Sequence, residues 1–444
     1  MRAMKHLVVS VAGLGWREWE TGGTERLAGL AFRPAASVFP AVTCVAQGTL
    51  RTGLPPAAHG MTSNGFWSHA LRRPSFWEQS SALVLGPRVW DAARAAGETV
   101  AFCFFQQSLG EDVDVLVSPA HVHFHGGGSA LYRWTVPPEA DESLRKARGT
   151  FPLWRYWGPL ARPEVGDACV GDFLFLADRY DPDIAFLYLP TLDYDAQRYG
   201  PDDPRAVRAR AVFRRELERL AAFAEQAGAD LTVFGEYAIA PVSAPPAFPN
   251  RTLRRAGLLR VRTVRGRAYP DFHLSKAFAM ADHEIAHVFV RDPDDIPFVR
   301  DVLAETGDYA EILARSDGGA WAHPSAGDLL LVAREGSWCA YPWWTDRREE
   351  PDYAAHVDIH AKPGFDPCEL FFDRRVPIPP ATARDPGRVR GTHGRVRPVA
   401  FASSAASPPS GETFEALAAG LPSLFAGTVP APDPAPSTRT SPLP

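Results

Sequence analysis

The sequence predicts an α/β protein with a mostly parallel central sheet, helices on both faces of that sheet, and a small α+β insertion. Short apolar runs rich in Val, Ile, Leu and Phe recur along the chain, as is typical of strands buried on both faces. Segments with helical spacing lie between them, and this alternation favours a doubly wound sheet. The expected strands are residues 6–11, 100–105, 184–189 and 231–234.

The expected helices are residues 89–96, 165–179 and 206–226. The last carries Phe213, Leu217, Leu220 and Phe223 at spacings of three and four, so one face of it is apolar. Its many arginines are interpreted as the polar face of the same helix and not as a nucleic-acid patch.

Residues 250–340 have a different pattern, which predicts a small α+β insertion or cap. Its expected elements are strands at 259–264, 285–290 and 328–332 and a helix at 296–305. We expect one large domain over residues 1–428 that includes this insertion and closes with a helix at 412–421. Residues 429–444 are mostly Pro, Ala, Ser and Thr, which predicts a disordered tail.

The overall composition excludes several classes of function. A chain of 444 residues, 45% of them hydrophobic, can bury a large core, and a net charge of -5 calls for neither a nucleic-acid nor a membrane partner. No apolar run reaches the roughly 18 residues that span a bilayer. The first apolar run lacks a cleavage site for a signal peptide, so we expect a cytoplasmic protein.

The five cysteines are scattered, which predicts neither a disulfide framework nor a zinc knuckle and fits a reducing compartment. They are Cys44, Cys103, Cys169, Cys339 and Cys368.

Thr43 is the candidate nucleophile. It lies where a helix running to about residue 50 is expected to begin. A hydroxyl there meets free backbone N–H groups and the positive end of the helix dipole, which stabilise a bound phosphate. The alternative is that Thr43 only caps the helix. Cys44 is a neighbouring thiol, interpreted as a small buried apolar residue.

Carboxylates follow two of the expected strands, where ligands bind in open α/β sheets. Asp193, Asp195 and Gln197 follow residues 184–189, and Glu236 follows residues 231–234. Hard oxygen ligands at such a position suit a divalent cation. The alternatives are an ordinary turn for the Asp193 segment and a solvated or capping role for Glu236.

Histidines supply a second group of possible ligands. Asp282 and His283 precede an expected strand, Asp358 and His360 lie close to Lys362, and His393 stands between glycines. His121, His123 and His125 alternate, which we interpret as an exposed edge strand in preference to a metal site. The chain has no HExxH motif.

Taken in order, four segments resemble the type I phosphodiesterase/nucleotide pyrophosphatase family of the alkaline phosphatase superfamily. They are VFPAVTCVAQGTLRTGLPPAAHGMTSN, YLPTLDYDAQRYGP, VFGEYAI and GTHGRVRPVAFASS, and ETFEALAAGL is similar to the closing helix of the family. The resemblance covers roughly residues 5–425 and implies an alkaline-phosphatase-like fold.

The resemblance implies a site in which two divalent cations clamp an in-line displacement at phosphorus. Thr43 would form a phospho-threonine intermediate. Asp193 and His393 would hold one cation, and Glu236 stands where the family has a metal-binding Asp.

Several ligand positions depart from the family pattern. Ala12 stands at the position of a metal-binding Asp, Gln197 and Tyr237 at the positions of histidines, and Ala46 where some relatives have Asn. The remaining set is rich in oxygen, which favours a single cation, or Mg²⁺ or Mn²⁺, over two zinc ions.

The segments ADH, AHV and DIHAKPGFDPCELF of this chain are similar to the corresponding segments of a divergent bacterial branch of the superfamily. This similarity implies a rearranged site in which His360, with His283, replaces the lost imidazoles. Asp282, Asp358 and Lys362 are further candidates, and Lys362 or helix N–H groups would stabilise charge.

The expected function is metal-dependent hydrolysis of a phosphodiester, pyrophosphate or phosphomonoester bond in a small phosphorylated substrate. One alternative is a catalytically impaired relative that binds a phosphorylated ligand or a partner protein. Another is a phosphoryl-transfer enzyme of a biosynthetic pathway.

Overall fold

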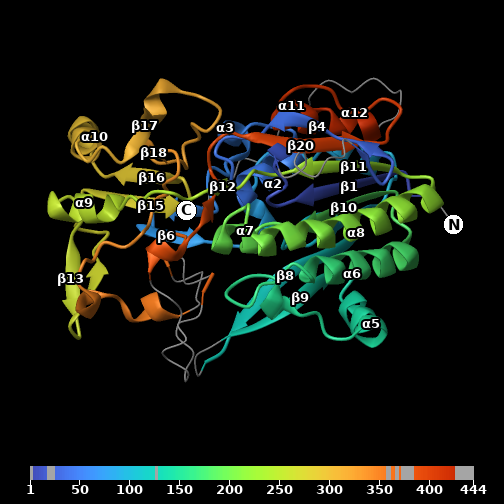
Figure 1. Cartoon of the computed structure of the whole chain (residues 1–444), viewed down its shortest axis with the longest axis horizontal. Coiled ribbons are helices and arrows are strands. Elements are labelled where there is room, and N and C mark those ends of the chain that lie inside the picture. Colours follow the sequence, from blue (N-terminus) through green and yellow to red (C-terminus); the bar gives the residue numbers. More distant parts are fainter. Residues whose placement is uncertain are drawn as a thin grey trace.

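A mostly parallel sheet forms the centre of the protein. The computed structural model describes residues 4–17, 26–125, 129–356, 362–365, 370–371 and 385–425. Within these ranges, eight strands form the largest sheet, in the order β4-β20-β11-β1-β10-β7-β8-β9 (Figure 1). Their bounds are β1 His6–Val11, β4 Arg33–Ala36, β7 Val100–Cys103, β8 Val115–His123, β9 Ser129–Val136, β10 Ile184–Leu189, β11 Asp230–Gly235 and β20 Pro398–Ser403.

The sheet is parallel in its middle and antiparallel at both edges. β1 lies between β10 and β11, and β7 and β8 continue the parallel set beyond β10. β9, β20 and β4 are antiparallel to their neighbours. The central strands are buried on both faces, which explains their continuous apolar sequences. The predicted α/β class is therefore confirmed.

Helices cover both faces of this sheet (Figure 1). α6 (Val165–Tyr180) and α8 (Pro204–Ala227) pack against each other on one face. α2 (Thr43–Thr52) packs against α11 (Phe414–Ala419) on the other. α8 begins just after Asp203, whose side chain accepts a hydrogen bond from the Arg205 N–H.

The remaining helices of the main body are shorter. They are α3 Pro56–His59, α4 Asp91–Ala95, α5 Glu139–Arg148, α7 Tyr194–Tyr199 and α12 Leu421–Phe425. None of these, nor any longer helix in the described ranges, has the length and apolar composition needed to cross a membrane.

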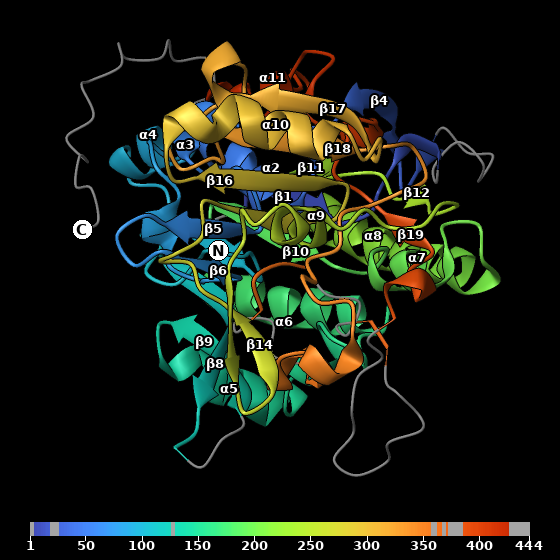
Figure 2. The same cartoon turned by 90° about the vertical axis from the view of Figure 1, so that its left-hand side faces the viewer.

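A second, antiparallel sheet lies beside the main one (Figure 2). Its four strands have the order β15-β16-β18-β17 within the described residues. The bounds are β15 Ala277–Asp282, β16 Ile285–Val290, β17 Tyr309–Ala314 and β18 Leu329–Ala333, with α9 Pro249–Arg255, α10 Ile296–Ala304 and the hairpin β13 Val261–Val264 and β14 Arg267–Pro270 nearby. It falls within the residues for which an α+β insertion is predicted and has its own apolar core.

Some predicted elements differ in extent. The helix predicted at 89–96 spans only Asp91–Ala95, and the closing helix is interrupted at Gly420 between α11 and α12. The alternating histidines do not lie on an edge strand, because β8 has β9 beyond it in the sheet. However, β7 pairs with β8 only over residues 115–117, so the stretch with His121 bonds to β9 alone.

Cys44, Cys103, Cys169 and Cys339 are buried and form no disulfide; Cys368 and the predicted tail at 429–444 lie outside the described residues.

A buried carboxyl group joins α8 to the turn after β10. Oε2 of Glu216 accepts a hydrogen bond of 2.7 Å from the Thr191 hydroxyl. Gly166 of α6 lies against the same pair, and a Cβ there would come within 2.2 Å of Glu216 Oε1. Burial raises the pKa of Glu216 to about 8, so this group is protonated in the folded protein at neutral pH.

This pKa predicts a pH-dependent stability. The unfolded chain loses the Glu216 proton near pH 4.5 and the folded chain near pH 8, so the stabilisation is complete below about 4.5 and is lost as the pH rises toward 8. The loss reaches about 1.4 kcal/mol per pH unit. Glu216→Gln cannot ionise, and urea unfolding between pH 5 and 8 should show a flatter slope for it than for the wild type. The exposed Glu218→Gln is the control, and equal slopes for Glu216→Gln and wild type would contradict the assignment.

Candidate active site

Thr43 is the first residue of helix α2. The capping residue is Val42, and no side chain caps this end, so the alternative role of Thr43 as a helix cap is wrong. Thr43 is 5% exposed, and its Oγ1 lies 3.2 Å from the hydroxyl of Tyr237. The hydroxyl therefore stands at the positive end of a ten-residue helix, as predicted, with a second hydroxyl beside it.

Asp193 lies immediately before α7, at the carboxyl end of β10. Its Oδ1 accepts a hydrogen bond of 2.7 Å from the Gln197 amide. Burial raises the pKa of Asp193, and the hydrogen bond from Gln197 opposes that shift. Gln197 thus positions Asp193 from one helical turn away.

Four aromatic rings form a continuous stack next to Thr43. Tyr237 and His393 are nearly parallel, with centroids 3.8 Å apart and planes 11° apart. His283 lies 3.9 Å from His393, and Phe365 lies 3.9 Å from His283. The stack brings together the segment after β11, the segment after β19 (Gly391–Thr392), the turn after β15, and residues 362–365.

The two histidines of the stack are held through Nδ1. His393 Nδ1 lies 2.8 Å from the carbonyl oxygen of Ala41, and burial lowers the pKa of His393, so this imidazole is neutral. Its Nδ1–H donates to the carbonyl, which leaves the lone pair on Nε2. His283 Nδ1 lies 2.9 Å from Asp282 Oδ1, and its buried Nε2 has no hydrogen-bond partner among the described residues.

Asp282 connects the second sheet to the start of α2. Its carboxylate accepts bonds from the Ser63 hydroxyl at 2.8 Å and from the Asn64 backbone N–H at 2.7 Å. Burial alone would raise the pKa of Asp282, but hydrogen bonds from His283, Asn64 and Ser63 lower it to about 2. Asn64 Oδ1 in turn accepts the backbone N–H of Cys44 at 3.0 Å.

Glu236 is completely buried at the end of β11. Its Oε1 accepts hydrogen bonds from Ser10 at 2.7 Å and from Gln47 of α2 at 3.0 Å. Burial raises its pKa to about 8, so the carboxyl is protonated at neutral pH. Oε2 has no hydrogen-bond partner in the described part of the chain.

The other candidates contribute in different ways. Asp358 and His360 lie outside the described residues, and Lys362 is buried, so their roles stay predictions. Within the described ranges, no three His, Cys, Asp or Glu side chains are grouped as metal ligands are.

Cys44 is buried, and burial raises the pKa of its thiol, which agrees with an inert apolar role.

A pocket opens beside Thr43 and Asp193. It encloses about 540 Å³ of empty space, part of it open to solvent. Its remaining lining is aromatic and neutral polar, namely Trp77, Gln79, Gln106, His121, Tyr156, Trp157, Tyr188, Pro190 and Tyr194. Sequence reasoning had no signal for the two glutamines.

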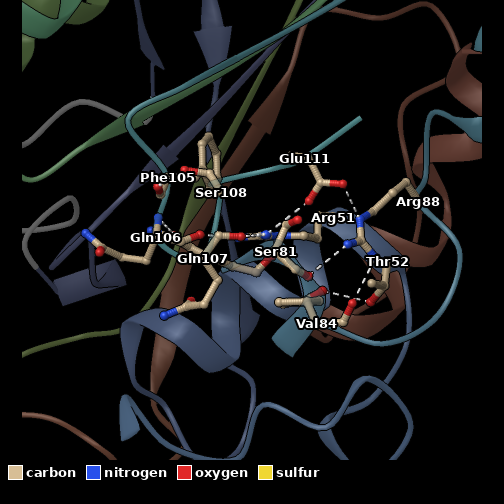
Figure 3. Close-up of polar contacts among 12 residues, drawn as sticks. Arg51, Thr52, Ser81, Val84, Arg88, Phe105, Gln106, Gln107, Ser108 and Glu111 are labelled. Atoms are coloured by element: carbon tan, nitrogen blue, oxygen red, sulfur yellow. Dashed lines mark hydrogen bonds and ion pairs between the residues drawn. The ribbon is translucent and has the colours of Figure 1, made fainter. Parts of the chain in front are cut away.

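A buried arginine of α2 holds one wall of this pocket. Arg51 donates to the carbonyl oxygens of Gln106 and Gln107 and, at 3.3 Å, to Glu111 Oε2. Figure 3 shows Glu111 between Arg51 and Arg88, and Arg88 Nε donates to Glu111 Oε1 at 2.8 Å. The helix that begins with Thr43 therefore also fixes the loop that carries Gln106.

Comparison with known proteins agrees with the resemblance in the sequence. Residues 6–366 match the family described as type I phosphodiesterase / nucleotide pyrophosphatase. No curated protein matches the chain.

Solved structures share the fold. Phosphonoacetate hydrolase from Sinorhizobium meliloti 1021, in complex with phosphonoformate or with phosphonoacetate, is similar with a TM-score of 0.62, 17% identity and coverage of 96% of both chains. Murine ectonucleotide pyrophosphatase / phosphodiesterase 5 is similar with a TM-score of 0.59, 15% identity and the same coverage. At these identities the likeness concerns the fold alone.

The Arg51 cluster predicts a large stability effect. Arg51→Met leaves two buried carbonyl oxygens and one carboxylate oxygen without their donor, so the free energy of unfolding should fall by about 3–5 kcal/mol in a urea titration. Arg208→Met, on the exposed face of α8, should change it by less than about 0.5 kcal/mol. A loss below about 1 kcal/mol for Arg51→Met would show that the cluster does not hold the loop.

Proposed function

Because this chain belongs to the type I phosphodiesterase/nucleotide pyrophosphatase family, we propose that it hydrolyses a phosphodiester or pyrophosphate bond with Thr43 as the nucleophile and a bound divalent cation. The family consists of phosphoester hydrolases. The observation that carries the proposal is the Thr43 hydroxyl, which stands at the positive end of a buried helix and lines a pocket of about 540 Å³.

In the proposed reaction, Thr43 Oγ1 attacks phosphorus and the bond to the leaving oxygen breaks. The product of this step is a phosphate ester of Thr43, which water then hydrolyses to restore the hydroxyl. The N-terminus of α2 favours the negative charge of the phosphoryl group throughout. Lys362 remains a candidate for the same role.

Individual donors near Thr43 have the chemistry of cation ligands, while the described residues do not group three of them as a metal site does. His393 is neutral and keeps its Nε2 lone pair, as a metal-bound imidazole does, and His283 has a buried, unpartnered Nε2 with a carboxylate behind its Nδ1. We propose that His393 and Asp193 hold the cation, with His360 or His283 as a further ligand. Glu236 would have to release its proton to join them. When bound, such a cation (Zn²⁺, Mg²⁺ or Mn²⁺) neutralises charge on the attacking oxygen and on the phosphate.

We further propose a small phosphorylated substrate. The pocket next to Thr43 is lined by aromatic and polar side chains, and similar structures hold phosphonoformate, phosphonoacetate and, in the murine protein, AMP. Its aromatic and amide lining would receive the uncharged part of that substrate.

The nucleophile is tested by Thr43→Ala. We expect the variant to lose at least about a thousandfold in the hydrolysis of a bis-aryl phosphodiester and of an aryl monophosphate, because it lacks the hydroxyl that forms the covalent intermediate. Thr263→Ala, an exposed position on β13, should keep the wild-type rate. Turnover by Thr43→Ala at the wild-type rate would exclude a threonine nucleophile.

The cation is tested by metal analysis after exhaustive dialysis. We expect about one or two divalent cations per chain, and most of this metal should be lost in His393→Ala and in Asp193→Asn. The exposed His273→Ala is the control. Protein that binds no Zn²⁺, Mg²⁺ or Mn²⁺ and shows no Thr43-dependent turnover would instead support a relative that only binds phosphorylated ligands.

A further inference from the structure

We propose that Gln79 determines the specificity of the pocket beside Thr43, because its side-chain oxygen accepts a hydrogen bond from an uncharged, planar group of the substrate. The preferred substrate is then a phosphodiester whose second ester group carries an N–H donor next to a C=O acceptor, as a carboxamide does. This inference rests on the proposed function of Thr43 and specifies the class of substrate.

Two hydrogen bonds fix the orientation of the Gln79 amide. Its Nε2 donates to the carbonyl oxygen of Trp77 at 2.9 Å and to Gln106 Oε1 at 2.7 Å. Turning the amide over would place its oxygen against the Trp77 carbonyl, where two acceptors repel each other. Both N–H groups of Gln79 are therefore in use, and its oxygen is the atom that remains.

This remaining oxygen, Gln79 Oε1, is a buried acceptor that has no donor in the described part of the chain. Gln79 is 7% exposed and lines the pocket. A buried polar atom without a partner is costly, and such atoms are rare in folded proteins. A bound group that donates a hydrogen bond to this oxygen removes the cost, so Gln79 favours ligands that carry a donor.

Gln106 supplies the complementary half of the pattern. It is also buried and lines the same pocket. Because its Oε1 already accepts a hydrogen bond from Gln79, the side chain of Gln106 has N–H groups to offer to a ligand. The two adjoining amides thus present one acceptor and one donor, which match the N–H and the C=O of a carboxamide.

The backbone holds both glutamines in place. The Gln79 carbonyl accepts the Leu109 N–H at 2.8 Å, and the Gln106 N–H donates to a side chain of α2 at 2.7 Å. The neighbouring residues Trp77 and Gln107 have φ angles of +58° and +45°, a left-handed conformation that residues other than glycine seldom adopt. Such conformations persist where the surrounding structure enforces them, and they are concentrated at ligand sites.

The rest of the lining fits an uncharged planar group. Aromatic rings surround the pocket, among them Trp77, Trp157 and Tyr188. Neither a lysine nor an arginine is found among the described residues that line it. A second anionic group bound there would lose its hydration without gaining a countercharge, which is unfavourable. The pocket therefore favours a diester with a neutral second group over a substrate that carries further phosphates.

Three phosphodiesters test this inference. Each has one para-nitrophenyl group, whose release is followed, and one phenyl group that carries a carboxamide, an acetyl group or a carboxylate in the para position. These substituents are similar in shape, but only the carboxamide donates a hydrogen bond and only the carboxylate is charged. We expect kcat/KM of the wild type to be at least about tenfold higher for the carboxamide than for the acetyl ester, and lowest for the carboxylate.

The matching variant is Gln79→Met, which removes the acceptor and keeps an unbranched side chain. The preference for the carboxamide over the acetyl ester should fall to within about twofold, because a thioether is only a weak acceptor. A mere loss of packing would slow both esters equally, so the ratio of their rates separates recognition from structural support. Gln226→Met, at an exposed position of α8, is the control and should keep the wild-type ratio.

The outcomes separate this inference from the proposed function. Equal kcat/KM for the carboxamide and acetyl esters in the wild type, or an unchanged ratio in Gln79→Met, overturns the inference and leaves the nucleophile standing. If Gln79→Met does not fold, the wild-type ratio decides. If no ester is turned over in a Thr43-dependent manner, the proposed function fails. Binding of benzamide and acetophenone to the wild type then decides the inference, since tighter binding of benzamide supports it and equal binding overturns it.

Discussion

The site depends on one constraint: helix α2 is buried along its whole length although several of its side chains are polar. Each of these side chains must find a partner inside the protein, since an unpaired buried polar group is costly. Gln47 bonds to Glu236 and to the Gln106 backbone, Thr49 to His59, and Arg51 to the loop after β7. These demands arrange β11, α3 and the pocket wall around the helix that presents Thr43.

Burial raises the pKa of both acidic groups around this helix, but their hydrogen bonds offset it to different extents. Glu236 accepts two hydrogen bonds from neutral donors, which do not offset its burial, and it stays protonated at neutral pH. Asp282 is equally buried but accepts bonds from Ser63, from the backbone and side chain of Asn64, and from His283, so it is ionised. The number and kind of donors therefore decide which carboxyl carries charge, and sequence position alone does not.

Much of the fold could be predicted because its signals are local. Strands buried on both faces give continuous apolar runs, and in a parallel sheet the residues after such strands meet at one edge, which led to Asp193 and Glu236. The ring stack could not be predicted, because Tyr237, His393, His283 and Phe365 come from four separate segments. The glutamines of the pocket have no periodicity. Gln106 is held by Arg51 and Gln47, and Gln79 donates to Gln106 Oε1.

The second sheet is not a detachable module. Asp282 and His283, from the turn between β15 and β16, reach Asn64 and His393, and Phe365 continues both the stack and the backbone contact to Ala281. A chimaera that exchanged this sheet for that of a relative would therefore also replace part of the support of the nucleophile. Substitutions in the two sheets are therefore expected to occur in pairs across their boundary. A design that introduces a new specificity into this protein must also keep the contact between Asp282 and Asn64.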